Sequence, residues 1–311
     1  MNSTTRFISN ILFDKEIDLV FFPPKNNDKF WDNFVKIGSS HYVIPALYYK
    51  LKERDYLKLL NDELVSYLEE IYNQNLKRNQ ELVKEVNEIS NFLKSNNIDH
   101  VFLKGAALVS SIYKESLGIR MVGDIDIFIS NDQIFKTQEL MLKNGYEKLT
   151  KYDGLKGRHL PRLINNNKVF VIELHLSLVN IDSSLTNHDA FLKRKIVEKV
   201  NILGWNDLLY HCILNFQIND YGSLRAIYSF RTFLDFYNIT KFNTESINKL
   251  EKSIHVDKFK LIINKIQGLD YKYGSSLIFF NFRLKLKSYS SLYSYFDNIF
   301  FNMIISFNLK N

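Results

Sequence analysis

The chain has few of the residues that interrupt or cross-link a backbone. Its 311 residues include one cysteine, four prolines and eleven glycines. A lone cysteine, Cys212, excludes an internal disulfide framework and a zinc site built from several cysteines. Proline and glycine are the strongest breaks in helical patterns, so their scarcity favours long helices. The composition therefore predicts a mainly helical protein.

Long apolar runs are also missing. A membrane-spanning helix needs about 18 or more consecutive apolar residues, and no stretch of the chain approaches that length. The most apolar segment near the C-terminus, residues 299–307, is short and contains Asn302. Residues 1–10 lack the apolar stretch of a secretory signal peptide. We therefore expect a cytoplasmic protein without a membrane partner.

Positive charge exceeds negative charge, with 41 lysines and arginines against 34 aspartates and glutamates and a net charge of +7. A polyanionic partner such as RNA or a nucleotide is one explanation. The lysines are spread along the chain and form no block. Because charge alone is not specific, we interpret it mainly as compositional bias.

Apolar residues recur every three or four positions on both sides of the chain's centre. This spacing places them on one face of a helix. It predicts helices over residues 30–37, 43–51, 64–93, 208–216 and 227–237. The sequence Gly38-Ser39-Ser40 predicts a break between the first two helices.

Strand patterns are confined to the middle of the chain. A short apolar run at 100–103 and alternating patterns at 124–129 and 169–176 predict three strands. Between them, one helix is expected from Lys104 to near Gly118 and another over residues 131–142. The predicted fold class is α+β, with an N-terminal helical region (1–95), an α/β core (96–180) and a C-terminal helical domain (181–311).

Two aspartates lie two positions apart in one predicted strand, at Asp124 and Asp126. Residues two apart on a strand point to the same face, so the carboxylates lie side by side while Ile125 and Ile127 bury the other face. Neighbouring carboxylates repel each other, and a divalent cation such as Mg²⁺ or Mn²⁺ removes that penalty. An Asp-x-Asp pair by itself is also compatible with a solvated strand edge.

A third carboxylate, Glu173, lies in the predicted strand Val171-Ile172-Glu173-Leu174-His175. A charge between apolar neighbours on a core strand is costly unless it is paired or bound to metal. Three carboxylates are what a two-metal site needs. His175 shares the face of Glu173, and a buried structural histidine is as good an interpretation of it as a functional one.

A basic residue and a glycine, Lys104 and Gly105, lie at a predicted strand-to-helix junction about 20 residues before the aspartate pair. A glycine permits close approach of the backbone to a phosphate, and the following helix directs its free N–H groups toward that phosphate. Taken alone, a simple turn glycine explains the pattern better.

Together these elements resemble the uncharacterised nucleotidyltransferase family of the DNA polymerase β superfamily, over about residues 40–270. Abortive-infection toxin nucleotidyltransferases are more distantly similar. The resemblance rests on four elements in order: Leu103-Lys104-Gly105-Ala106-Ala107-Leu108, Gly118-Ile119-Arg120-Met121-Val122-Gly123-Asp124-Ile125-Asp126, Asn144-Gly145-Tyr146 and Ile172-Glu173-Leu174-His175.

The resemblance implies a small mixed sheet with flanking helices and a helical C-terminal half. It implies that a nucleoside monophosphate is transferred from a nucleoside triphosphate such as ATP to a hydroxyl acceptor, with release of pyrophosphate. By position, the resemblance implies these roles: Asp124, Asp126 and Glu173 as catalytic metal ligands for Mg²⁺ or Mn²⁺, and Lys104, Gly105, Ala106 and Arg120 as nucleotide-binding residues.

The turn departs from the superfamily pattern, because Gly105-Ala106 stands where Gly-Ser or Gly-Gly is usual. The gap from that turn to Asp124 is also longer than is typical. A catalytically inactive nucleotide- or partner-binding module on the same fold therefore remains an alternative, and so does a phosphodiesterase or nuclease. The acceptor is left open among a small molecule, a protein and RNA.

Several other polar residues are weaker candidates. Arg120 could contact a phosphate or pair with Asp124, and structural pairing is equally compatible. The basic segment Lys156-Gly157-Arg158-His159 could cover a nucleotide, although a solvated surface explains it better. His211 and Asp235 resemble family positions, and each is equally compatible with helix packing.

Overall fold

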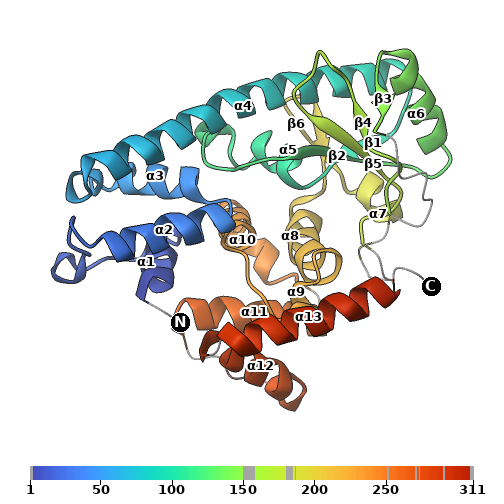
Figure 1. The fold of residues 1–311 in the computed structure, drawn as a ribbon. Coiled ribbons are helices and arrows are strands. Elements are labelled where there is room, and N and C mark those ends of the chain that lie inside the picture. The colour runs from blue at the N-terminus through green and yellow to red at the C-terminus, as the bar shows by residue number, and fades with distance from the viewer. Residues whose placement is uncertain are drawn as a thin grey trace.

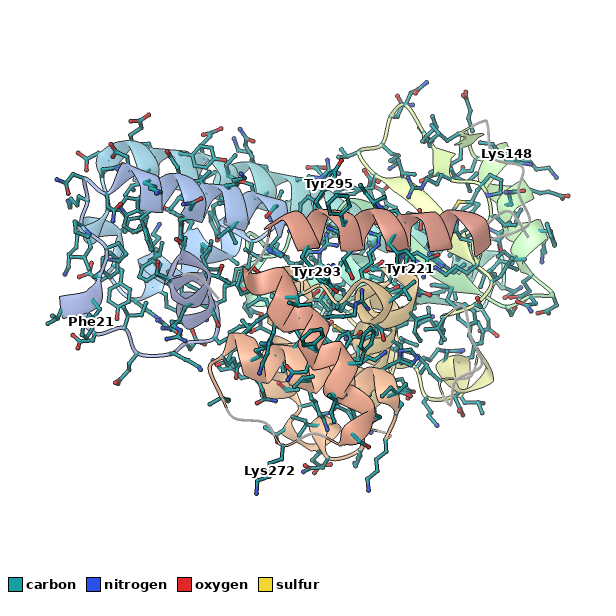
Figure 2. The ribbon with its side chains drawn as sticks, turned by 60° about the horizontal axis from the view of Figure 1, so that its bottom comes forward. Phe21, Lys148, Tyr221, Lys272, Tyr293 and Tyr295 are labelled. Atoms are coloured by element: carbon teal, nitrogen blue, oxygen red, sulfur yellow. The ribbon has the colours of Figure 1, made fainter. Side chains whose placement is uncertain are left out.

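The computed structural model describes residues 3–149, 158–179, 185, 187–250, 252–269, 272, 274–289 and 291–308. Figure 1 shows helices at one end, a sheet at the other and a C-terminal group of helices below and between them. The exposed Phe21 and Lys148 lie near opposite ends of this arrangement (Figure 2). No helix among the described residues is long and apolar enough to cross a membrane.

The N-terminal part consists of helices that pack through aromatic and aliphatic side chains, with Trp31 and Phe34 buried against Phe7. Its helices are α1 (Ser3–Leu12), α2 (Asp28–Ser40), α3 (Ile44–Glu53) and α4 (Asp62–Ser95). The longest, α4, begins where the Asn61 side chain accepts a hydrogen bond from the N–H of Leu64. It runs from the N-terminal helices to the sheet (Figure 1) and so connects the two ends.

The predicted break at Gly38-Ser39-Ser40 is displaced in the structure. These residues form the last turn of α2, and the chain reverses after it at Tyr42, which has φ +56°. A Cβ at Gly38 would lie 2.6 Å from Ile44 Cδ1. The glycine therefore permits close packing of α2 on α3 and does not end the helix.

Within the described residues, the sheet has seven strands in the order β3-β4-β5-β2-β1-β7-β6. Their bounds are β1 His100–Phe102, β2 Asp124–Ile129, β3 Glu147–Lys148, β4 Leu163–Ile164, β5 Val171–His175, β6 Lys195–Val197 and β7 Val200–Ile202. The two longest strands, β2 and β5, are parallel neighbours near the centre. Since β1 is antiparallel to β2 and parallel to β7, the sheet is mixed.

The β6–β7 hairpin differs from the predicted helical character of residues 181–311. It lies at one edge of the sheet, where Phe102 of β1 pairs with Ile202 of β7. Backbone groups of β1 that β2 does not satisfy gain partners from β7. Both strands are only three residues long, too short for the alternation that would reveal them in the sequence.

Short helices follow the core strands. They are α5 (Lys104–Val109), α6 (Ile134–Lys143) and α7 (Asn187–Leu192). The predicted helix from Lys104 to near Gly118 is shorter in the structure, because α5 ends at Val109 and turns follow. This brings Gly118 against α4, where its carbonyl accepts a hydrogen bond from Asn75 at 2.7 Å.

The C-terminal part is helical beyond β7. Its helices are α8 (Trp205–Leu214), α9 (Gly222–Arg225), α10 (Phe230–Phe242), α11 (Ile254–Ile266), α12 (Ile278–Tyr289) and α13 (Ser291–Asn308). In Figure 1, α8 and α10 lie between the sheet side and the lower helices α11 and α13. The predicted α+β class, with helices before and after a mixed sheet, is confirmed.

Candidate active site

Two carboxylates meet on the central strands. In the parallel register of β2 and β5, Asp126 pairs with Glu173. Alternate residues such as Ile125 and Ile172 are fully buried on the opposite face. Adjacent strands lie about 4.8 Å apart, so the register brings two acidic side chains together from positions 47 apart in the sequence (173 minus 126).

Asp126 is almost completely buried, with 1% of its side chain exposed. Lys104 Nζ donates a hydrogen bond to its Oδ1, and His175 Nε2 lies 2.7 Å from the same atom. Burial by itself raises the pKa of Asp126, but the hydrogen bond to His175 and the charge of Lys104 outweigh it and hold the pKa well below its usual range. Asp126 is therefore ionised.

Glu173 is similarly enclosed and has its own cationic partner. Arg162 Nε donates to Glu173 Oε1 at 2.6 Å, and His175 Nε2 lies 3.4 Å from Oε2. Burial opposes ionisation, but the hydrogen bond to His175 lowers the pKa of Glu173 to about 2. Asp126, Glu173 and His175 can each offer one ligand atom, and these atoms all lie within 4.8 Å of one another. We call these three residues the carboxylate cluster.

Asp124 lies at the start of β2 and is half-buried. Burial, followed by the charges of Asp126 and Glu173, raises its pKa. Within the part of the chain that the structure describes, its carboxylate has no hydrogen bond or ion pair of its own. Asp124 thus lies close enough to interact electrostatically with the cluster, but the compact three-residue group includes His175 and not Asp124.

The predicted nucleotide-binding turn has a packing role in the structure. Lys104 begins α5 with φ +47°, and Ala106 is fully buried. A Cβ on Gly105 would lie 2.8 Å from a methyl carbon of Val122. This contact accounts for the glycine through packing between α5 and the segment before β2.

Arg120 points away from the aspartate pair on β2. It is buried, and its Nε lies 2.9 and 3.0 Å from the two oxygens of Asp235 on α10. Tyr113 Oη donates to the same Asp235 carboxylate at 2.9 Å. Arg120 is thus held by Asp235 rather than by Asp124.

His211 of α8 is 1% exposed, and its Nε2 has no hydrogen-bond partner in the described ranges of the chain. Burial lowers its pKa to about 3, so its imidazole is neutral. Of the predicted basic segment, Lys156 and Gly157 lie outside the described residues. His159 forms a β-bridge with His175, and the centres of their rings are 5.4 Å apart.

Arg162 is the residue that sequence reasoning missed. It precedes β4 and reaches Glu173 across the antiparallel pairing of β4 with β5. The sequence around it carries no motif, because β4 contains only two residues. Only the strand pairing shows that this arginine neutralises a carboxylate of the cluster.

A family model described as "Uncharacterised nucleotidyltransferase" matches residues 27–261. Among solved structures, the solution structure of the antibiotic-resistance factor ANT(2'')-Ia is similar, with a TM-score of 0.38 and 8% sequence identity. That similarity covers 61% of this chain and 95% of the other. No curated protein matches. The family match includes the carboxylate cluster and helices α8 and α10.

Proposed function

The chain belongs to the uncharacterised nucleotidyltransferase family, and from this premise we propose that it is a metal-dependent nucleotidyltransferase acting at the carboxylate cluster. In this reaction a hydroxyl oxygen of the acceptor attacks the α-phosphorus of a nucleoside triphosphate such as ATP. The bond from the α-phosphorus to the bridging oxygen breaks, pyrophosphate leaves and the hydroxyl proton passes to solvent. Such transfer depends on positioning and charge neutralisation more than on covalent chemistry.

The observation that carries this proposal is the pairing of Asp126 with Glu173 on parallel strands. Both are buried, and hydrogen bonds from His175 and nearby cations keep both ionised. Burying two like charges side by side is costly unless positive charge accompanies them. A protein that needed only packing here would be more stable with apolar residues on this face.

The donor set fits a divalent cation. Asp126 and Glu173 supply carboxylate oxygens, which are the ligands that Mg²⁺ and Mn²⁺ prefer, and His175 supplies a nitrogen. Asp124, whose carboxylate has no hydrogen-bonding partner among the described residues, is the additional ligand in this proposal. When bound, such a cation would neutralise charge on the phosphates and polarise them for attack.

The chain's own side chains have separate roles in this proposal. His175 holds the Asp126 carboxylate in one orientation, and Arg162 does the same for Glu173. Lys104 brings positive charge to the phosphates from the start of α5. The acceptor class remains a small hydroxylated molecule, a protein hydroxyl or an RNA 3′ end. The cytoplasm is the compartment we propose.

One observation favours the alternative of a catalytically inactive binding module. Lys104 and Arg162 already neutralise the two buried carboxylates, so the cluster is balanced by the protein's own cations. The packing explanation of Gly105 points the same way. Such a module would bind a nucleotide without releasing pyrophosphate.

Incubation with α-labelled nucleoside triphosphates, Mg²⁺ or Mn²⁺ and a cell extract tests the proposal. We expect label to reach a protein, RNA or small-molecule fraction, with release of pyrophosphate. The variant Asp126→Asn keeps the size of the side chain and removes its charge, and we expect it to lose transfer by about 1,000-fold or more, equivalent to about 4 kcal/mol.

Asp132→Asn is the matched control, since Asp132 is exposed just beyond β2. It should label the same fraction at the wild-type rate. Equal labelling by wild type and Asp126→Asn would refute the enzymatic proposal. Binding of triphosphate without pyrophosphate release would support the inactive module instead.

A further inference from the structure

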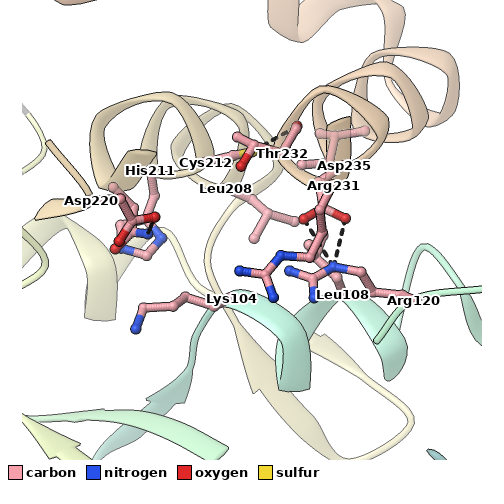
Figure 3. A pocket seen from close by; sticks show the side chains of 12 residues that line it. Lys104, Leu108, Arg120, Leu208, His211, Cys212, Asp220, Arg231, Thr232 and Asp235 are labelled. Atoms are coloured by element: carbon pink, nitrogen blue, oxygen red, sulfur yellow. Dashed lines mark hydrogen bonds and ion pairs between the residues drawn. The ribbon is translucent and has the colours of Figure 1, made fainter. Parts of the chain in front are cut away.

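A pocket opens beside the carboxylate cluster, between α5 on one side and helices α8 and α10 on the other (Figure 3). It is small, and water-sized molecules can occupy about 60 Å³ of it before it opens to solvent. Lys104, which donates to Asp126, also lines this pocket, so pocket and cluster are neighbours. The charged side chains lining it are Lys104, Arg120, Arg231, Asp220 and Asp235.

Most of these charges have a partner within the protein. Arg120 is paired with Asp235, and Lys104 with Asp126. The carboxylate of Asp220 accepts a long hydrogen bond of 3.4 Å from Asn215. These contacts give each of the four charged groups a structural explanation.

Arg231 is the exception. It is the second residue of α10, is half-buried, and has no hydrogen bond or ion pair within the described part of the chain. Its guanidinium carbon lies 5.0 Å from the centre of the Tyr42 ring, and the charges of Asp235 and Asp220 attract it at longer range. A guanidinium carries five N–H donors, and none of those of Arg231 donates a hydrogen bond to another described residue.

The position of Arg231 is also electrostatically unfavourable. Its guanidinium lies beside that of Arg120 (Figure 3). Repulsion by Arg120, followed by burial, lowers the pKa of Arg231. Two like charges held together at a pocket wall are a penalty for the free protein, and an anion in the pocket would remove that penalty.

We propose that this pocket binds the polyphosphate tail of the donor nucleotide and that Arg231 is a positioning residue for it. Arg231 reaches the pocket from α10 and Lys104 from α5 (Figure 3), so an extended anion can contact both. A planar guanidinium donates paired hydrogen bonds to phosphate oxygens. This inference rests on the proposed function, because the polyphosphate is assigned to the nucleoside triphosphate.

The unfolding temperature without ligand separates an arginine that positions a ligand from one that holds the fold together. Arg231→Gln removes no ion pair or hydrogen bond among the described residues. It relieves the repulsion of Arg120 but gives up the contact with the Tyr42 ring and the attraction of Asp235 and Asp220. Because these changes oppose each other, the ligand-free variant should unfold close to the wild-type temperature. A structural arginine would lower that temperature when replaced.

Calorimetric titration with inorganic triphosphate, at low salt and with divalent cations chelated, measures anion binding without catalysis. We expect Arg231→Gln to weaken binding by about tenfold or more, since a hydrogen bond to a charged group contributes that much. Arg194→Gln is the matched control: Arg194 pairs with Asp99 and does not line this pocket, so binding should be unchanged. Inorganic phosphate and AMP should bind more weakly than triphosphate.

Wild-type affinity in Arg231→Gln, or a large loss of ligand-free thermal stability, would overturn the inference. Equal affinity for inorganic phosphate and triphosphate would overturn the assignment to a polyphosphate. If triphosphate binding depends on Arg231 but no nucleotide is transferred, the anion site stands and the proposed function fails. If transfer occurs and Arg231→Gln keeps the wild-type KM for ATP, the site fails and the proposed function stands.

Discussion

Two buried groups of charges, the carboxylate cluster and the Arg120–Asp235 pair, differ in how completely the protein satisfies them. The carboxylate cluster holds Asp126 and Glu173 with His175 between them. The other group is the Arg120–Asp235 pair, which joins the segment before β2 to α10. Both are buried, so burial alone does not separate a structural pair from a candidate site.

The Arg120–Asp235 pair is closed, in the sense that each charge is balanced by the other within the protein. Asp235 accepts from Arg120 and Tyr113, and Tyr113 in turn accepts a hydrogen bond from Asn238 at 3.2 Å. Arg120 Nη1 donates to the backbone carbonyl of Met121. One positive and one negative charge therefore balance each other within the protein.

The carboxylate cluster is open by comparison. It contains two carboxylates, Asp126 and Glu173. The positive charges that balance them belong to Lys104 and Arg162, which lie on other elements and whose side chains are 21% and 51% exposed. Among the residues that the structure describes, the buried Nδ1 of His175 has no hydrogen-bond partner. Asp124 adds a further negative charge at the same face. Because Lys104 and Arg162 are partly exposed to solvent, they can move aside when a ligand binds to the carboxylates. The buried partners of the Arg120–Asp235 pair cannot be exchanged in this way.

Breaking the closed pair should have the largest effect on stability. Asp235→Ala leaves Arg120 buried without its counter-charge, and we expect the free energy of unfolding to fall by about 3–5 kcal/mol. Chemical denaturation measures this. The double variant Arg120→Met with Asp235→Leu should recover most of the loss, since apolar residues then fill the site. A loss below about 1 kcal/mol in Asp235→Ala would show that the pair is not closed.

The open cluster should respond to divalent cations. Mg²⁺ or Mn²⁺ at 100 times its dissociation constant should raise the free energy of unfolding by about 2.7 kcal/mol, because only the folded chain brings the ligands together. Asp126→Asn and Glu173→Gln should lose this stabilisation. Asp132→Asn, the exposed control, should keep it. Equal stabilisation of Asp126→Asn and wild type would place the cation elsewhere.

His41 shows how burial by itself shifts the pKa of a side chain. It stacks on Tyr228, with ring centres 4.8 Å apart, and burial lowers its pKa to about 4 from 6.5. Between pH 6.5 and 4 the unfolded chain takes up a proton that the folded chain does not, so stability falls as the pH falls. Above pH 6.5 neither state is protonated and His41 has no such effect.

Of the three predicted changes in the free energy of unfolding, the one from His41 is the smallest. At pH 5 it amounts to at most about 2 kcal/mol, from 1.36 kcal/mol per pKa unit, because the ring is partly exposed to screening solvent. His41→Phe keeps the aromatic stacking and should reduce the loss of stability between pH 7 and pH 5 by that amount. An unchanged pH dependence would contradict the role assigned to burial.

Much of the fold could be predicted from periodicity. The helical stripe over residues 64–93 lies within α4, and the alternation at 124–129 coincides with β2. Such patterns are local, because they follow from the repeat of one element against one core. The β6–β7 hairpin could not be predicted this way, since its three-residue strands exist through pairing with β1 and with each other.

The candidate site was also predictable from the sequence only in part. Alternation predicted that Asp126 faces away from its buried isoleucine neighbours, and that Glu173 and His175 share a face. No pattern near Arg162 indicated that it would contact Glu173, because that contact depends on the register between β4 and β5. Arg120 is a second example: a structural pairing was one interpretation of it, but nothing near it in the sequence indicated that the partner would be Asp235 of α10.

The sequence by itself determined which side chains share a face and which segments are helix or strand, because those properties repeat over a few residues. The tertiary structure alone decided which charges are matched. Hydrogen bonds and Coulomb interactions depend on distances of a few ångströms, and helices and strands far apart in the sequence set those distances. For that reason Arg120 is paired with Asp235, while Arg231 lines a pocket and has no hydrogen-bond partner among the described residues.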